Sequence, residues 1–364
     1  MSVRHVVMNI TSKPDLTIVS LFAGCGGSSL GYKQAGYDIR LAVEWDKGAA
    51  DVYRRNFPDT NIFEGDITDL TAEKALKITA LEPRELDVLD GSPPCQGFST
   101  AGQRKFSDTR NRLFEEYVRM VEVFKPKMLV MENVSGLRKG KMKLVFAEMT
   151  KALKDAGYKV SCRELNASWY GVAQDRRRLI WVGVREDLAV IPSHPKPTVS
   201  VPVSASRALG AAEMQLERAW GKRQKPFESF KSNLAPTLQS IRRPRIRLKN
   251  PDFENKWKDG SGVSPTLKAT TPLKITGSRT FPCNANRDGK SLGQPSLTLA
   301  AIRPPSITDG DSVRYLTIEE SKVLQGFPEQ FDIWEKEYKF IGNSVCPPMA
   351  EAIGRHLITL LEEV

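Results

Sequence analysis

Over its first half, the chain alternates short apolar runs with amphipathic stretches. The apolar, partly β-branched runs predict buried strands at residues 17–22, 39–43, 86–90, 128–131 and 179–184. Helical periodicity predicts helices at 113–124 and 143–156, and a further helix that follows Ser28 and closes at Gly36. Regular alternation of strands and helices predicts an α/β fold with a Rossmann-like sheet.

This alternation stops near residue 186. A proline-rich stretch at 191–202 is typical of a linker, and 203–310 holds only short β-prone runs. Regularity returns near Val313: a helix is predicted to begin after the N-cap Thr317 and reach Leu324, and a last one covers 350–361. The predicted division is a large domain at 1–185, a smaller, irregular β-rich domain at 186–310, and a segment at 311–364 that returns to the large domain.

Charge separates these parts further. The 364 residues carry a formal charge of +11 with a pI of about 9.4. Residues 186–310 contain 20 Lys and Arg against 10 Asp and Glu, which is +10 and leaves about +1 for the rest. A basic domain attached to a near-neutral one indicates contact with a polyanion, most simply nucleic acid. A merely solvated basic surface is the alternative.

Cysteine usage and hydropathy limit the setting of the protein. The five cysteines, at 25, 95, 162, 283 and 346, form no C-x-x-C pair. We therefore expect a reducing, intracellular location, with neither a disulfide framework nor a zinc site or other metal. The sequence contains no apolar run of about 18 residues and no signal-peptide pattern, so no membrane association is expected.

A glycine turn follows the first strand. Residues 17–22 run directly into Ala23-Gly24-Cys25-Gly26-Gly27, and a helix is expected next. A strand, glycine turn and helix in this order let a nucleotide-like cofactor approach the backbone. An NAD site would have its third glycine at position 29, which is Ser29, so the spacing argues against NAD. A P-loop is excluded because no Gly-Lys-Ser/Thr follows.

Acidic residues come after the next two apolar runs. Glu44 lies 20 residues beyond the glycine turn, where a carboxylate can accept hydrogen bonds from ribose hydroxyls. Trp45 can cover an adenine ring, and Asp66 can accept from an adenine amino group. A strand-end salt bridge beside a core tryptophan is the alternative reading of Glu44 and Trp45.

The strand at 86–90 ends in Gly91-Ser92-Pro93-Pro94-Cys95. Two prolines fix φ and remove two backbone donors, so Cys95 is expected on a stiff turn at the ligand-binding edge of the sheet. A buried structural cysteine is the alternative. The polar, basic residues 96–110 are long enough for a mobile lid, although a solvated loop has the same composition.

Charged residues accompany two later strands and the basic domain. Glu132 follows the strand at 128–131 and is expected to face the same cleft as Cys95. Strand-like alternation would point Arg176 and Arg178 to one face, where they suit an anionic or carbonyl-bearing guest. The densest basic run contains Arg242, Arg243, Arg245 and Arg247, whose alternation suits phosphates.

The ordered set of these motifs resembles the DNA cytosine-5 methyltransferases. The resemblance covers 17–185 and 314–364, and its motifs are Phe-x-Gly-x-Gly-Gly, Glu-Trp, Gly-Asp-Ile, Pro-Pro-Cys-Gln, Glu-Asn-Val, Gln-x-Arg-x-Arg, Leu-Gln-Gly-Phe-Pro and Gly-Asn-x-Val. The chain departs from the pattern at Asn111, where the family has glycine, and at Cys346, which is inserted before a proline pair.

The resemblance implies a core that binds S-adenosylmethionine and a smaller domain that recognises DNA. By resemblance Phe22 packs on the adenine, Gly24 to Gly27 pass under the methionine part, and Glu44 holds the ribose. The implied cofactor-binding residues are Phe22, Gly24, Gly26, Gly27, Glu44, Trp45, Asp66, Ile67, Pro94, Leu113, Asn343 and Ser344.

The resemblance also implies a mechanism. The Cys95 thiolate adds to C6 of a cytosine flipped out of duplex DNA, which makes C5 nucleophilic enough to accept a methyl group. Glu132 acts at N3 and the exocyclic amine, Arg176 contacts the O2 side and Arg178 supports Cys95.

Further implied residues contact DNA, and they are Gln96, Ser99, Arg104, Lys105, Arg110, Gln174, Arg242, Arg243, Arg245 and Arg247. We expect a monomer that acts on duplex DNA, with a companion restriction endonuclease possible, in the cytoplasm or nucleoid if the source is prokaryotic. Two alternatives stay open: a tRNA-directed enzyme with the same catalytic core, and a catalytically silent DNA-binding regulator.

Overall fold

The computed structural model describes residues 16–94, 112–140, 142–209, 313–334 and 337–364, together with four short strands between 274 and 308.

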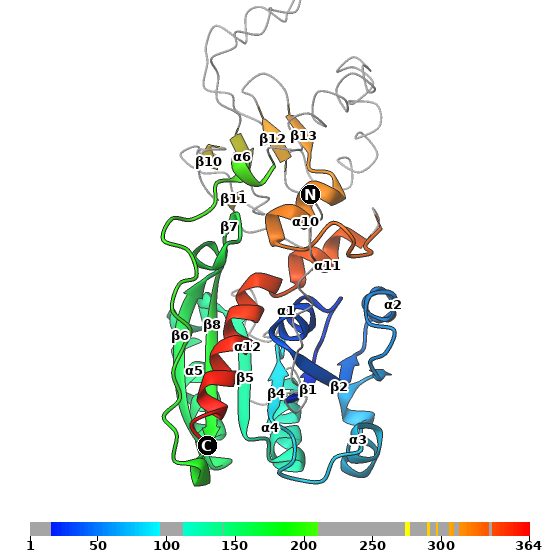
Figure 1. Ribbon diagram of the computed structural model, residues 1–364, viewed down its shortest axis with the longest axis vertical. Helices are drawn as coiled ribbons and strands as arrows, with labels where there is room; N and C mark the ends of the chain where they lie inside the picture. The colour runs from blue at the N-terminus through cyan, green and yellow to red at the C-terminus, as the bar shows by residue number, and fades with distance from the viewer. Residues whose placement is uncertain are drawn as a thin grey trace, which may run out of the picture.

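A seven-stranded sheet organises the large domain (Figure 1). Its strands lie in the order β3-β2-β1-β4-β5-β8-β6. Strands β1 to β5 are mutually parallel, whereas β8 runs antiparallel to both of its neighbours. The bounds are β1 Leu16–Leu21, β2 Tyr37–Glu44, β3 Ile62–Glu64, β4 Val88–Gly91, β5 Met128–Val134, β6 Tyr158–Asn166 and β8 Arg177–Arg185. The predicted α/β fold is confirmed.

Successive apolar side chains of the central strands enter two different cores. In β1, Ile18 packs into the core on one face of the sheet and Val19 into the core on the other. Val88 and Leu89 divide in the same way in β4. Because both faces are covered, the strands are apolar at nearly every position, which explains why they appear in the sequence as continuous apolar runs.

Helices cover both faces of the sheet (Figure 1). One face carries α1 Gly27–Ala35, α2 Lys47–Asn56 and α12 Pro347–Leu361, and the other carries α3 Ala72–Thr79, α4 Arg112–Phe124 and α5 Met142–Asp155. Helix α1 ends at Gly36, whose φ of 103° is the left-handed conformation expected of a C-terminal cap. Helices α2 and α3 were not expected from the sequence.

The C-terminal helices link the large domain to the region above it in Figure 1. Helix α10 spans Ile318–Gln325 and begins at the predicted cap, Thr317, which forms a capping box with Glu320. Helix α11 follows at Tyr338–Asn343. The remaining short helices are η1 Ile67–Asp69, η4 Ser135–Arg138, η5 Ala167–Tyr170, η6 Glu186–Leu188 and α6 Ala205–Ala208.

Between residues 210 and 312 the structure describes four short strands of the predicted smaller domain. A four-stranded antiparallel sheet has the order β10-β9-β12-β13, with bounds β10 Lys290–Ser291, β9 Lys274–Thr276, β12 Ser306–Thr308 and β13 Val313–Tyr315. Strand β11 Ser296–Leu297 pairs in parallel with β7 Gln174–Asp175. The smaller domain is therefore hydrogen-bonded directly to the segment that precedes β8.

The proline-rich stretch predicted to be a linker lies against the large domain. His194 is within 3.1 Å of the Ser161 hydroxyl on β6, and Ser193 is within 2.8 Å of His356 on α12. The backbone N–H of Thr198 donates to the carbonyl of Trp169. These contacts attach the stretch to β6, α12 and η5 instead of leaving it free between two domains.

Among the helices in the described ranges, none combines the length and the apolar character needed to cross a bilayer.

Candidate active site

One packing contact and one hydrogen bond fix the turn that precedes Cys95. Gly91 packs so closely that an added Cβ would lie 2.7 Å from the Tyr117 ring, so only glycine fits there. The Asn133 amide, buried on β5, donates to the carbonyl of Pro93 at 3.0 Å. The chain is thus held up to Pro94, one residue before Cys95. Cys95 itself lies outside the described residues.

Three other thiols have surroundings that make them poor nucleophiles. Burial raises the pKa of Cys25 and of Cys162 to about 12, and that of Cys346 to about 11. At neutral pH these three side chains are therefore protonated thiols, and it is the thiolate that attacks carbon.

Beside this turn, Glu132 and Arg178 form an ion pair. Glu132 lies near the end of β5, and its Oε1 is 2.7 Å from Nε of Arg178 on the adjacent strand β8. Their side chains are 13% and 14% exposed, so the pair is largely shielded but not completely enclosed. A charge-assisted hydrogen bond of this length fixes the direction of the carboxylate.

The guanidinium of Arg176 is bound by backbone carbonyls of the C-terminal turn, and its expected contact with the base stays a prediction. Its side chain is 2% exposed, and its guanidinium donates to the carbonyls of Gly342 at 2.9 Å and Ser344 at 2.8 Å. Burial, followed by the nearby charge of Arg178, lowers the pKa of Arg176 to about 10, so the side chain is still charged at neutral pH. Arg176 lies between β7 and β8, outside either strand, so the alternation of side chains along a strand does not apply to it.

Gln174 is also bound by groups within the protein. Its side chain is fully buried, and Nε2 donates to Oε1 of Gln325 at 2.7 Å and to the carbonyl of Leu324 at 3.3 Å. Gln325 in turn donates to the carbonyl of Ser344 at 2.9 Å. The Gln174 side chain is thus enclosed within the protein, and its predicted contact with DNA stays a prediction.

The glycine turn has the geometry of a ligand cradle. Gly24 has a φ of +57°, and a Cβ added there would meet no atom within 4 Å, so its backbone is open to a guest. Its N–H donates to Oε2 of Glu44 at 2.8 Å, and Oε1 accepts from the N–H of Asp46. Each carboxylate oxygen retains a lone pair for a ribose hydroxyl. These residues fit S-adenosylmethionine, and the assignment stays a prediction.

The predicted residues of the C-terminal turn lie directly beside the glycine turn. A Cβ on Gly27 would lie 2.3 Å from the carbonyl oxygen of Val345, so the two segments touch backbone to backbone. The Ser344 hydroxyl is buried 3.0 Å from the Cys25 sulfur, whereas Asn343 is exposed. Asn343 directly precedes Ser344, which lies against Gly27, and its expected contact with the cofactor stays a prediction.

Other predicted cofactor residues lie along the same edge of the sheet. Trp45 is 75% exposed at the end of β2. Asp66 accepts hydrogen bonds from Thr68 and so caps η1, and the neighbouring Ile67 is buried. Two further predicted residues, Pro94 and Leu113, are partly buried. Phe22 and Gly26 both have positive φ, as the turn requires.

Several predicted residues lie outside the described part of the chain, and they are Cys95, Gln96, Ser99, Arg104, Lys105, Arg110, Arg242, Arg243, Arg245 and Arg247. Two residues that the site predictions missed are Asn133 and Gln325. Both belong to motifs present in the sequence, Glu-Asn-Val and Leu-Gln-Gly-Phe-Pro, but their partners Pro93 and Ser344 become apparent only in the folded chain.

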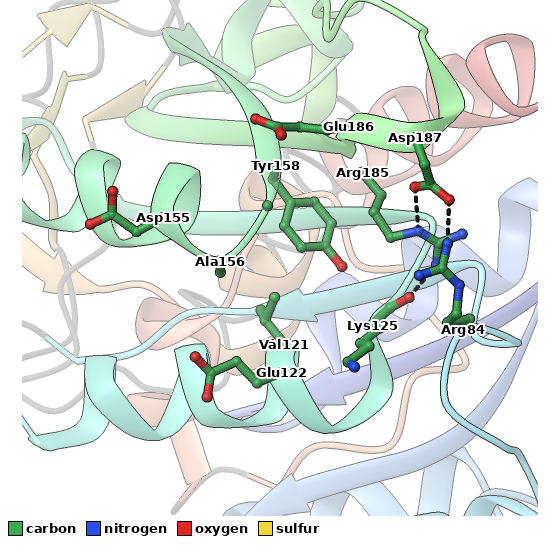
Figure 2. Close-up of a pocket in the computed structure, with 11 residues that line it drawn as sticks. Arg84, Val121, Glu122, Lys125, Asp155, Ala156, Tyr158, Arg185, Glu186 and Asp187 are labelled. Atoms are coloured by element: carbon green, nitrogen blue, oxygen red, sulfur yellow. Dashed lines mark hydrogen bonds and ion pairs between the residues drawn. The ribbon is translucent and has the colours of Figure 1, made fainter.

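A hollow of about 430 Å³ lies far from these residues, at the opposite end of the strands (Figure 2). It is lined by Lys125, Tyr158 and Arg185 among others. Asp187 at the rim of the hollow is paired with Arg84 and Arg185, so these three charged side chains already have partners within the protein. We assign no ligand to it.

Comparison with known proteins agrees with this geometry. A family profile described as C-5 cytosine-specific DNA methylase matches residues 16–359. The type II methyltransferase M.XorII of Xanthomonas oryzae pv. oryzae is 32% identical over 95% of this chain and 85% of its own length. The type II methyltransferase M.FnuDI of Fusobacterium nucleatum is 37% identical over 94% of each chain.

A solved structure agrees as well. The crystal structure of a candidate DNA modification methyltransferase encoded within an Escherichia coli prophage superposes with a TM-score of 0.65 at 26% identity. The match covers 96% of this chain and all of that one. Profile, relatives and fold lead to one conclusion: this chain belongs to the C-5 cytosine-specific DNA methylase family.

Proposed function

We propose that Cys95, Glu132 and Arg178 together methylate carbon 5 of a cytosine flipped out of duplex DNA. The enzyme class, a DNA cytosine-5 methyltransferase, and the methyl donor, S-adenosylmethionine, follow from the family. The observation that supports these residue roles best is the Glu132–Arg178 pair, which lies beside a turn that Asn133 ties down just before Cys95.

Cys95 provides the covalent step. Its thiolate forms a bond to C6, and the electron pair of the C5–C6 double bond moves into the ring, which makes C5 nucleophilic. After C5 has gained its methyl group and lost its proton to a base, the sulfur–carbon bond breaks, the double bond re-forms and the thiolate is regenerated. The high pKa of the three other described thiols supports assigning this role to Cys95.

Glu132 manages charge on the ring during the addition. A carboxyl group at N3 can hold or supply a proton as negative charge builds there. Arg178, at 2.7 Å, fixes the orientation of Glu132 and lies where it can also meet the O2 side of the base. We therefore assign to Arg178 the base-side position that the sequence had suggested for Arg176.

Bound S-adenosylmethionine supplies an electrophilic methyl group. Glu44 would hold the ribose, Trp45 and Phe22 the adenine, and the turn at Gly24 the methionine portion. A side chain at position 27 would clash with the carbonyl of Val345, so Gly27 allows the C-terminal turn to lie directly against the glycine turn.

DNA contacts belong to the lid and to the basic domain in this proposal. Residues 186–310 hold nearly the whole net charge of the chain, and Arg242, Arg243, Arg245 and Arg247 are its densest run. By analogy with the type II relatives, we propose that this domain reads one short DNA sequence and that a restriction endonuclease of the same specificity accompanies the enzyme. We further propose that the enzyme works inside the cell as a monomer.

The test is bisulfite sequencing after incubation with S-adenosylmethionine. The purified protein should protect cytosines from conversion within one short sequence of duplex DNA, and Cys95→Ala should protect none. Transfer RNA provides the comparison substrate, because methylation of tRNA alone would assign the protein to the tRNA-directed class. A Cys95→Ala variant as active as the wild type would remove Cys95 from the mechanism.

A further inference from the structure

Asp90 is a buried carboxylate to which the proposed mechanism gives no role. It is 3% exposed and lies in β4, one residue before the turn that leads to Cys95. Oδ1 accepts from the Tyr32 hydroxyl at 3.1 Å and Oδ2 from the Ser20 hydroxyl at 3.2 Å, and Ser28 also donates to it. All of its hydrogen-bonding partners are neutral hydroxyls.

Those partners come from the segments that carry the cofactor turn. Ser20 lies in β1, two residues before Phe22, where the turn begins. Ser28 and Tyr32 lie in α1, which starts directly after Gly26. Asp90 therefore connects the end of β4, which carries the nucleophile turn, to both sides of the glycine turn.

An ionised side chain at this position opposes folding. Burial, with a smaller contribution from the charge of Glu132, raises the pKa of Asp90 to about 6, so it is ionised at neutral pH. Within the described ranges no Lys or Arg forms an ion pair with it. Its strand neighbours Val88 and Leu89 show that apolar residues pack well at this level of the sheet. Groups whose ionisation costs stability are concentrated at functional sites.

We propose that Asp90 is a positioning residue of the methyltransferase, which holds the turn at 91–94, directly before Cys95 in the sequence, in register with the glycine turn at 22–27. It touches neither substrate nor cofactor. Through Ser20, Ser28 and Tyr32 it sets the distance between the thiol and the methyl donor, on which methyl transfer depends steeply. This inference rests on the proposed function.

Asp87 is a matched control on the same pair of strands. It accepts from the backbone N–H of Thr17 at 2.8 Å and from its hydroxyl at 3.0 Å, and Lys127 lies 2.7 Å away. Thr17 and Ser20 both belong to β1, and each is 70 residues from its aspartate. Asp87 therefore joins β1 to β4 as Asp90 does, but at the end of the strands away from the site.

The experiment compares Asp90→Asn with Asp87→Asn in the full-length protein, measuring kcat, KM for S-adenosylmethionine and the midpoint of urea unfolding. Asp90→Asn should lower kcat and raise KM for S-adenosylmethionine, reducing kcat/KM by at least about tenfold, with an unchanged or higher unfolding midpoint. Asp87→Asn should lower the midpoint and leave kcat and KM within about twofold of the wild type.

The inference is overturned if Asp90→Asn has a lower unfolding midpoint than the wild type and yet, while folded, keeps wild-type kcat and KM. If Asp90→Asn does not fold, Tyr32→Phe removes one donor and should reproduce the kinetic loss in part; wild-type kinetics there also contradict the inference. Failure of the proposed function is distinguishable, because the wild type itself would then methylate no cytosine in duplex DNA.

Discussion

Acidic side chains are held in different ways at the two ends of the central strands. At the end away from the site, Asp87 is paired with Lys127, and Asp187 with Arg84 and Arg185. At the site end, Glu44 accepts from backbone N–H groups and Asp90 from hydroxyls, and burial raises the pKa of both carboxyls.

The difference separates side chains that support the fold from side chains that serve the chemistry. A carboxylate paired with a cation gains favourable electrostatic energy in the native state. A carboxylate buried among neutral donors is harder to ionise than in water, which opposes folding at neutral pH. The burial of Glu44 and Asp90 therefore carries a free-energy cost at neutral pH.

Other acids at the site end do have cationic partners: Glu132 pairs with Arg178, Asp46 with Lys339 and Glu64 with Arg54. The Glu132 and Arg178 side chains are 13% and 14% exposed, so the pair is not completely enclosed. Another Glu–Arg pair nearby, Glu164 with Arg177, is more exposed and its closest atoms are 3.7 Å apart. The same substitution in each pair distinguishes a catalytic glutamate from one that only forms a structural ion pair.

The largest expected effect is that of Glu132→Gln. Removing the ionisable carboxyl should lower kcat by about 10²-fold or more, since positioned proton transfer contributes about 10²–10⁴-fold in enzymes. Glu164→Gln, the same change in the neighbouring pair, should leave kcat within about twofold. Steady-state methylation of a duplex with both variants decides this, and equal losses would place Glu132 among the merely structural acids.

A smaller effect concerns stability and pH. The pKa of Asp90 is raised to about 6 in the folded protein from 3.8, so between pH 4 and 6 the native state holds a proton that the unfolded state has lost. The contribution of Asp90 to stability is then complete below about pH 4 and is lost as pH rises through 6. A shift of this size corresponds to about 3 kcal/mol.

In Asp90→Asn the side chain at position 90 cannot ionise, so the pH dependence of stability due to Asp90 is absent. The free energy of unfolding of Asp90→Asn minus that of the wild type should therefore grow by up to about 3 kcal/mol from pH 4 to pH 7. Urea titrations at several pH values measure the difference. A difference independent of pH would mean that Asp90 ionises as readily in the folded chain as in the unfolded one, and the comparison between the two ends would lose its basis.

Much of this architecture follows from local patterns in the sequence. The strands at 17–22, 39–43 and 128–131 were predictable because both faces of the sheet are covered, so their apolar runs are unbroken. The cap at Thr317 and the turn at Gly36 were predictable because their chemistry is local to the chain. Glu44 and Glu132 lie at the predicted strand ends.

What could not be predicted depends on contacts between distant segments. Arg176 and Gln174 appeared to be ligand-facing because their motif is charged and polar, yet their partners Gly342 and Gln325 are about 150 or more residues away. In the sequence, Asp90 is a single polar position in an apolar strand. Its burial against α1 depends on the pairing of β1 with β4 and is apparent only in the folded chain. Periodicity predicts which face of a helix or strand a residue occupies, but it does not predict which residues from distant segments contact it there.

The most direct test of the central claim uses a duplex with 5-fluorocytosine at the methylated position. Fluorine on C5 cannot leave as a proton does, so the bond between sulfur and C6 should persist after methyl transfer. We predict a denaturation-resistant protein–DNA adduct that requires S-adenosylmethionine, maps to Cys95 by peptide mass spectrometry and is absent from Cys95→Ser. No adduct, or an adduct on Cys25, Cys162 or Cys346, would contradict the account.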